Sequence, residues 1–483
     1  MLVREILREL DLGSSVAEQD KMLERYFVET EPFRSVVRDK HDVIAGDKGT
    51  GKSALYTILG KRYSQIPEMN LIEVVSAFNT LGTPVFQRLA EGEVLSEQSY
   101  INIWKTYFLA LAGNWILEFA DGDYTDTMRK LDELLNELRV RTKDDTPGGV
   151  FSKILSKLKL SVNSAEVSGT GKAGPAEISA KVALVFDPTR HDSDEVEHDH
   201  YLRLLDRILA DMDVTIWLTV DRLDEAFQGR PDFEKPVLRA LFRAYLDMQE
   251  FSRVKLKLFV RRDLFRRITS GGFVNLTHVN ARKVEIIWYD LDLFDLLHKR
   301  FLENESFVRS LQLDDTSANS IFYAVFPKQV DQGDAKPTTW NWMLSRIADG
   351  NRVRPPRNLI DLVLKTVEEQ LREEEREQRE YVPGTPLISP DALKRGLERL
   401  SEERVIDTLL AEAGEHAHLI EKFRNGKAEH NRGTLTELLG ENYNSSVEFL
   451  TTVGFLEPVG TNYKVPMLYR AGLQITQGKA FTP

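Results

Sequence analysis

The chain has 483 residues, a length that suggests about two to four domains of ordinary size. Hydrophobic residues make up 42% of it and charged residues 29%, which excludes extensive disorder, and the lack of cysteine excludes disulfides, thiolate metal sites and a cysteine nucleophile. The formal net charge of -12 argues against a protein whose main task is to coat nucleic acid.

The N-terminal sequence MLVREILRELDLG places charges in every turn and has no apolar segment of the signal-peptide type. No stretch approaches the ~20 uncharged apolar residues that a membrane-spanning helix needs. We therefore expect a soluble, cytoplasmic protein with no membrane partner. Residues 17–29 are predicted to form one helix that ends near Val28.

A phosphate-binding motif follows. Residues 42–46 are a short apolar strand, residues 53–63 continue as a helix, and GDKGTGKS between them matches the P-loop pattern G-x-x-x-x-G-K-[ST]. Its glycines let backbone N–H groups converge on phosphate oxygens at a helix N-terminus, whose dipole favours anions. Lys52 should reach the β- and γ-phosphates, and Ser53 should bind Mg²⁺. The nucleotide-binding residues predicted here are Gly46, Lys48, Gly49, Thr50, Gly51, Lys52, Ser53 and Ala54.

Strands and helices then alternate. Further strands are predicted at 71–78, 214–220, 254–260 and 284–289, and helices at 99–120, 126–140, 201–211 and 237–248. Such alternation is typical of an α/β fold with a three-layer parallel sheet. Residues 157–186 alternate apolar and polar side chains around a glycine-rich turn, which predicts an inserted β-hairpin that packs on the core or on a neighbouring subunit. The GTGK at 169–172 lies in this turn and lacks the remainder of a P-loop.

A magnesium-binding acid should end another buried strand. Asp221 follows the strand at 214–220 directly and is the predicted metal ligand together with Ser53. Hydrolysis also needs a group that orients or deprotonates the attacking water. Because the residue directly after Asp221 is Arg222, that group must lie elsewhere in the motif, and Asp224 and Glu225 are the candidates.

Arginines cluster where the strand at 254–260 ends. A basic group there can sense the γ-phosphate or act on a neighbouring subunit, and a solvated helix face paired with local acids is the alternative. Arg261 directly follows the strand and is the preferred catalytic candidate; the others are Arg262, Arg266 and Arg267.

Beyond residue 290 the sequence pattern becomes mainly helical. We predict a P-loop core at 1–290, a helical lid at 291–382 and a winged-helix-like domain at 383–483, in which helices precede a hairpin around EPVGTNYK. In the lid, Arg354 or Arg357 opens a helix and either side chain has the length to reach back to the nucleotide, with helix capping as the alternative. Arg357 is the predicted contact.

Taken in order, the motifs GDKGTGKSAL, DRLDEAF, LFVRRDLF, WYDLDLFDLLHKRF and RVRPPRNLIDLV resemble the AAA+/STAND group of P-loop ATPases, with its initiator, KAP and NACHT-type branches. They also look like an incompletely characterised bacterial family with GxKGTGKSAL and DRLDE motifs. The resemblance covers about residues 40–475. It implies ATP as the nucleotide, Mg²⁺ as the metal, and a lid held by a winged helix. Many relatives have a glutamate directly after the metal-binding aspartate, and Arg222 at this position leaves open slow hydrolysis or a switch that rarely turns over.

That resemblance also implies a biological role. Its members often act as nucleotide-gated switches that form homo-oligomers, and many belong to bacterial antiphage systems in which a separate effector protein acts. A DNA-binding loader or initiator is the alternative function, and it requires a basic winged helix. Residues 385–483 are slightly acidic, with 11 lysines and arginines against 13 aspartates and glutamates, which favours a protein partner over DNA.

Overall fold

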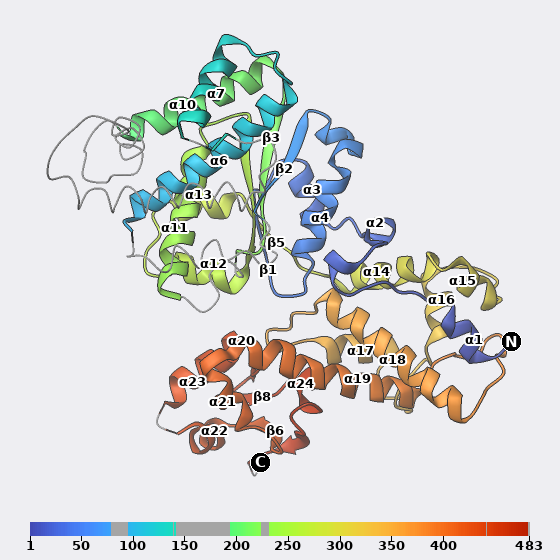
Figure 1. The fold of residues 1–483 in the computed structure, drawn as a ribbon. Helices are drawn as coiled ribbons and strands as arrows, with labels where there is room; N and C mark the ends of the chain where they lie inside the picture. Colours follow the sequence, from blue (N-terminus) through green and yellow to red (C-terminus); the bar gives the residue numbers. More distant parts are fainter. Residues whose placement is uncertain (79–94, 139, 142–193, 224–230, 441, 482–483) are drawn as a thin grey trace. The chain divides into compact units, whose positions relative to one another are not determined.

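The computed structural model describes residues 1–78, 95–138, 140–141, 194–223, 231–440 and 442–481 (Figure 1). These residues pack into two compact units. We call Glu31–Gly46 with Lys52–Ile286 the sheet unit, and Met1–Thr30, Asp47–Gly51 and Ile287–Pro483 the helical unit. The domain boundaries expected near 290 and 382 stay predictions. The inserted hairpin predicted at 157–186 lies outside the described residues.

The sheet unit is built on five strands in the order β2-β3-β4-β1-β5, and each neighbouring pair is parallel. This confirms the predicted parallel α/β sheet. β1 is apolar and buried throughout, and β3 is buried at every residue except its first, as expected for strands covered on both faces. The strands are β1 Val43–Gly46, β2 Ile72–Phe78, β3 Thr215–Val220, β4 Val254–Arg261 and β5 Lys283–Glu285.

Helices cover both faces of this sheet (Figure 1). The P-loop helix α4 lies against β1, β2 and β4, whereas α6 and α11 pack on each other and on β2, β3 and β4. The apolar face of α6 is almost entirely buried, so this helix forms the centre of the core of the unit. The helices of the unit are α3 Glu31–Val37, α4 Lys52–Arg62, α6 Glu97–Phe119, α7 Asp126–Glu137, α10 Asp194–Asp211, α11 Pro231–Met248, α12 Arg262–Thr269 and α13 Leu276–Ala281.

The most extensive helix–helix packing in the helical unit is between α18 Pro356–Arg376 and α19 Pro390–Arg404. They approach closely at Gly396, where a Cβ atom would lie 2.4 Å from the Thr366 hydroxyl oxygen, so only glycine fits. The other helices between the N-terminus and residue 347 are α1 Val3–Arg8, α2 Leu23–Tyr26, α14 Asp290–Leu302, α15 Glu305–Ser310, α16 Ala318–Val325 and α17 Thr339–Ile347.

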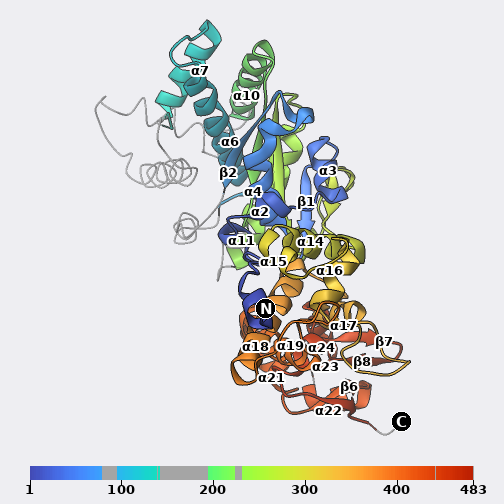
Figure 2. The ribbon, with the colours of Figure 1, turned by 90° about the vertical axis from the view of Figure 1, so that its right-hand side faces the viewer.

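The C-terminal part of this unit contains a second, four-stranded sheet in the order β7-β8-β6-β9 (Figure 2). β7 and β8 form the antiparallel hairpin predicted around EPVGTNYK, and it follows two helices, α22 and α23. The chain leaves α19 through a π-helical turn, Val405–Leu410. The elements here are α20 Ala411–Ala413, α21 Ala417–Glu421, β6 Lys427–His430, α22 Arg432–Leu439, α23 Tyr443–Thr452, β7 Glu457–Val459, β8 Asn462–Lys464, α24 Met467–Arg470 and β9 Thr476–Lys479.

The N-terminal segment differs from the predicted single helix over residues 17–29. Only short pieces form, a 3-10 turn at Ala17–Gln19 and α2. Between them Asp20 is extended, and its buried carboxylate accepts hydrogen bonds from Tyr26 and from Arg300 on α14. A continuous helix would remove the extended backbone at Asp20, so we attribute the break to this tertiary ion pair.

Within the described residues, no helix is both long enough and apolar enough to cross a lipid bilayer.

The Arg300–Asp20 pair should contribute strongly to stability. Its side chains are 4% and 1% exposed, with 2.9 Å between Arg300 Nη2 and Asp20 Oδ2. Removing one partner of a buried pair leaves an uncompensated charge and costs ~3–5 kcal/mol. We expect Arg300→Met to lower the free energy of unfolding by about this amount, measured by urea denaturation followed by circular dichroism.

The matched control is Arg352→Met. Arg352 pairs with Glu457 at 3.0 Å, but its side chain is 77% exposed, and such pairs are worth ~0–1 kcal/mol. Equal losses in the two variants would contradict a structural role for the buried pair.

Candidate nucleotide site

The P-loop has the backbone that its glycines predict. Gly49 and Gly51 have φ angles of +77° and +98°, a region that residues with a Cβ atom rarely adopt. The carbonyl of Asp47 accepts hydrogen bonds from the backbone N–H and the hydroxyl of Thr50, at 3.3 and 2.8 Å. Lys52 begins α4, and its ammonium group donates to the carbonyl of Gly46 at 3.1 Å. Hydrogen bonds between residues of the loop therefore hold its backbone, and one of them comes from the lysine that should bind phosphate.

The turn Asp47–Gly51 is anchored within the helical unit through three of its residues, the first two of which are Lys48 and Thr50. Lys48 forms an ion pair with Glu412 at 3.2 Å, and its ammonium group donates to the carbonyl of Asp407 at 3.5 Å. The indole N–H of Trp288 donates to the carbonyl of Thr50 at 2.7 Å.

The third contact is at Gly49. A Cβ atom there would lie 3.1 Å from the Cβ of Arg357 and 3.3 Å from that of Pro355, a close approach that adds to the positive φ in favouring glycine. The lid residue predicted to approach the nucleotide, Arg357, therefore lies against this turn. Its Nε is buried and has no hydrogen-bond partner among the described residues.

A second arginine lies close to Arg357. Burial, and then the charge of Arg357, lowers the pKa of Arg404 to about 10. Arg404 donates to Asn358 at 2.8 Å and pairs with Asp361. The other lid candidate, Arg354, pairs with Asp290 at the start of α14. Of these three arginines, Arg354 and Arg404 are thus paired with acids, and it is Arg357 that lies against Gly49.

Asp221 lies directly after β3 and is 2% exposed. Burial raises the pKa of its carboxyl group from 3.8 to about 6, against the opposing effects of the Arg222 N–H, the Lys52 charge and the Ser53 hydroxyl. Arg222 has a φ of +59°, so the chain turns sharply at the metal-ligand position. Among the described residues, the Oδ2 atom of Asp221 has no hydrogen-bond partner.

These features fit a divalent cation. The carboxyl group of Asp221 is hydrogen-bonded to the Ser53 hydroxyl, while its buried Oδ2 atom has no partner among the described residues. The carboxylate and the hydroxyl are the hard oxygen ligands that Mg²⁺ prefers. Asp221 and Ser53 would hold the metal, which would neutralise phosphate charge. This is the ligand pair that the motifs predict.

Strand pairing places a third predicted residue at the same edge. β4 lies between β1 and β3, and Arg261 at its end pairs in register with Gly46. The Arg261 guanidinium donates to Asp263 at 2.9 and 3.1 Å. Burial would raise the pKa of Asp263, but the charge and hydrogen bonds of Arg261 outweigh it and hold the pKa below its usual value.

The remaining arginines of this cluster pair with acids. Arg262 lies 3.3 Å from Glu285, and Arg267 lies 3.1 Å from Glu234. Arg266 lies on α12 near the same Glu285, whose pKa it helps to lower. Arg262 and Arg267 are thus paired with local acids, as in the alternative interpretation, although the Arg262 and Glu234 side chains are only 20% and 10% exposed.

Asp224 and Glu225, the candidates for activating water, lie outside the described residues and stay predictions.

A row of hydroxyl groups beside Asp221 was missed in the sequence. Tyr56 lies three residues after Ser53 and therefore on the same face of α4. Its hydroxyl lies 2.5 Å from the Ser76 hydroxyl at the end of β2, and burial raises its pKa while hydrogen bonds with Ser76 and Thr219 oppose this. The helical spacing from Ser53 was the available signal. The other two hydroxyl groups, on Ser76 of β2 and Thr219 of β3, are brought together by the register in which these two strands pair.

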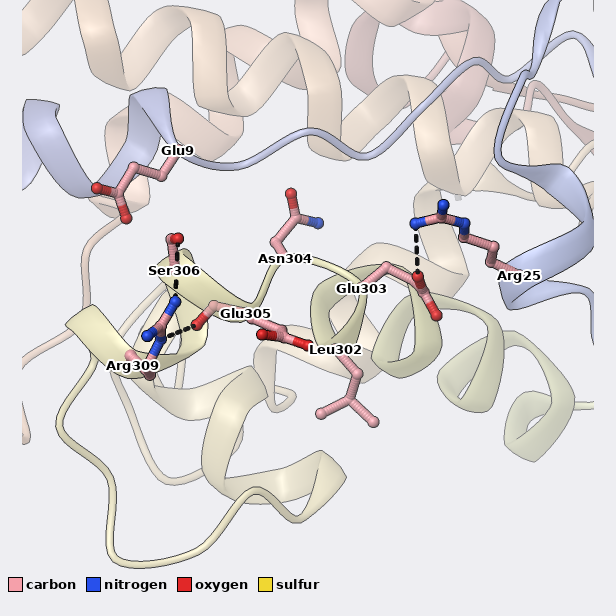
Figure 3. Close-up of a pocket in the computed structure, with 8 residues that line it drawn as sticks. All are labelled: Glu9, Arg25, Leu302, Glu303, Asn304, Glu305, Ser306 and Arg309. Carbon is pink, nitrogen blue, oxygen red and sulfur yellow. Dashed lines mark hydrogen bonds and ion pairs between the residues drawn. The ribbon is translucent and has the colours of Figure 1, made fainter.

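A hollow of about 460 Å³ lies between α1, α2 and the α14–α15 junction (Figure 3). Both of its arginines bond within its own walls: Arg25 pairs with Glu303 at 3.8 Å, and Arg309 donates to the Glu305 carbonyl at 3.3 Å and to Ser306 at 3.4 Å. We therefore place the candidate site at the P-loop.

No protein-family model and no curated protein matches the chain. Among solved structures, it is similar to that of the Aeropyrum pernix ORC2 protein in ADPNP–ADP complexes. The two share 13% sequence identity over 94% of this chain and 97% of that chain, with a TM-score of 0.38. A similarity at this level carries no information on ligands or partners.

The pKa of Asp221 gives a test of the metal site. Metal binding requires the carboxylate, so we expect the Mg²⁺-dependent part of ATP affinity to fall as the pH drops through about 6. Calorimetric titrations with and without Mg²⁺ between pH ~5 and ~8 would measure this. Asp221→Asn should bind ATP more weakly and should lose that step, and an unchanged step in the variant would contradict the assignment.

The same group makes a second measurement possible without ligands. Its folded-state pKa of about 6 lies above the ordinary 3.8, so the native state retains the proton between these values. The contribution of Asp221 to stability is therefore greatest below pH ~4 and declines as the pH rises to ~6. Metal-free Asp221→Asn should be more stable than the wild type at pH ~8, and this advantage should vanish below pH ~4.

Proposed function

We propose that the chain binds Mg²⁺-ATP at the P-loop and acts as an oligomerising ATP-dependent switch. The observation that carries the proposal is the pairing of a preformed phosphate loop with a buried, incompletely satisfied carboxylate. Gly49 and Gly51 supply the loop backbone, Lys52 its charge, and Asp221 with Ser53 the oxygen ligands. This set fits a nucleoside triphosphate, whose phosphates need N–H donors, a lysine and a metal.

Two further observations support phosphate as the ligand. Arg357 lies against Gly49 and places a positive charge beside the loop. Arg261, next to Gly46 in the sheet, is held by Asp263, an interaction that a γ-phosphate would compete with. ATP rather than another nucleotide rests on the resemblance to AAA+/STAND proteins and on the absence of the guanine-reading motif N-K-x-D from the sequence.

A switch is favoured over a fast hydrolase by the contacts of the P-loop turn. Lys48, Gly49 and Thr50 each contact residues beyond 287 in the helical unit. A ligand that changes this turn must change the free energy of those contacts, which is the requirement for a nucleotide to control the remainder of the chain. Hydrolysis belongs to the proposal, with Asp224 or Glu225 acting on water.

A protein partner is favoured over DNA by the surface of the C-terminal sheet region. The order α22, α23 and the β7–β8 hairpin is that of a winged helix, in which the helix before the hairpin would enter the major groove. The sequence of α23, YNSSVEFLTT, contains no lysine or arginine, and its exposed face carries Asn444, Ser445 and Glu448. Duplex binding relies on cations against phosphate, so this face suits another protein. A role in antiphage defence with a separate effector comes from the resemblance.

The first test is the mass of the protein by light scattering without nucleotide, with ADP and with ATP, alongside Lys52→Ala. We expect ATP to produce a larger assembly in the wild type and no change in the variant, which loses the phosphate contact. ATP affinity should fall by more than about tenfold, since a charge-assisted hydrogen bond is worth ~1.5–3 kcal/mol.

The matched control is Lys61→Ala, at the far end of the same helix and about 14 Å along its axis. It should bind ATP and assemble like the wild type. A monomer in every nucleotide state would exclude an oligomerising switch. Strongly salt-dependent binding of duplex DNA would instead support the loader or initiator function.

A further inference from the structure

We propose that Trp288 is a positioning residue that sets the direction of a phosphate-binding N–H group in the P-loop. The proposal rests on the function proposed above. Trp288 lies two residues before α14, and its indole N–H donates to the carbonyl of Thr50 at 2.7 Å. Thr50 is 2% exposed, so this carbonyl has little access to water as an alternative partner.

The hydrogen bond fixes more than one atom. The peptide unit between Thr50 and Gly51 is planar, and in a trans peptide the carbonyl and the N–H point in opposite directions. When the Thr50 carbonyl is held by Trp288, the Gly51 N–H must point to the other side of the loop. Gly51 immediately precedes Lys52, the first residue of α4, so its N–H belongs to the set that a P-loop presents to phosphate.

This peptide unit needs such a constraint. Glycines occur on both sides of Thr50, at Gly49 and Gly51, both at positive φ, and glycine permits backbone rotations that other residues prevent. An indole is a donor only, with no acceptor atom. Trp288 can therefore stabilise the orientation in which the Thr50 carbonyl faces the indole. It forms no hydrogen bond in the flipped orientation, in which the Gly51 N–H would face the indole.

The indole ring is itself held in place. Trp288 is half-buried and packs against a small apolar cluster of Val28, Leu296 and Ile360, with Leu364 on its border. These residues come from the N-terminal segment, α14 and α18. The ring thus transmits the packing of three separate segments of the helical unit to one peptide unit of the P-loop. By linkage, phosphate bound at Gly51 stabilises the same packing.

The test is Trp288→Phe, which removes the N–H donor and keeps an aromatic ring. Because the side chain is half-buried, the variant retains most of its packing, which an unfolding curve without ligand verifies. We expect the affinities for ADP and for inorganic pyrophosphate, each with Mg²⁺, to fall roughly 2- to 10-fold, as for the loss of one hydrogen bond. Pyrophosphate carries no base or sugar, so a loss there reports the phosphate cradle itself.

The matched control is Trp342→Phe. Its indole nitrogen is buried and has no hydrogen-bond partner among the described residues, so the same substitution removes a donor that holds nothing. Both affinities should stay at the wild-type value in this variant. If Trp288→Phe binds both ligands like the wild type, or if both variants lose affinity equally, the positioning role is overturned.

Lys52→Ala separates this inference from the proposed function. If Lys52→Ala loses ADP and Trp288→Phe does not, only the role of Trp288 fails. If Lys52→Ala binds ADP like the wild type, the nucleotide site itself fails.

Discussion

The position of β4 between β1 and β3 is the constraint on which the candidate site depends. Parallel pairing aligns the carboxyl ends of these three strands, so that the start of the P-loop at Gly46, the arginine at 261 and the carboxylate at 221 meet at one sheet edge. Ligands of open α/β sheets bind outside this edge. The chemistry of the site therefore follows from strand order, since the three residues are far apart in the sequence.

Buried charged groups have hydrogen-bond partners at one edge of the sheet and lack them in part at the other. At the amino edge Lys257 is 0% exposed, and its ammonium group is bonded to Asp39, to Asp42 and to the carbonyl of His41. Burial would raise the pKa of Asp42, but a hydrogen bond from Arg282 and the charge of Lys257 outweigh it and hold the pKa below its usual value. At the carboxyl edge the Asp221 carboxyl has its pKa raised instead. A satisfied charge network stabilises a fold, whereas an unsatisfied carboxylate is a cost that a ligand relieves.

The P-loop turn connects this chemistry to the remainder of the chain. Lys48 contacts Glu412 beside a π-helical turn, a distortion often found at functional positions. With the packing of Pro355 on Gly49 and the bond from Trp288, each of three successive residues is tied to a different part of the helical unit. These ties are individually modest. Together they make the shape of the loop depend on residues as far along the chain as Glu412, 364 positions after Lys48.

The local features of the fold and the site follow from short stretches of sequence. Residue spacing identified the P-loop, and the turn residues located the β7–β8 hairpin. Apolar runs predicted strands at 42–46, 71–78, 214–220 and 254–260, within one residue of the strands in the structure, because these signals lie within a few neighbouring residues. Tertiary structure alone decided the remainder. The break at Asp20 follows from Arg300, the neighbours of Tyr56 follow from sheet register, and the role of Trp288 follows from a carbonyl 238 positions earlier. Such contacts are fixed by packing between distant segments, which no local pattern encodes.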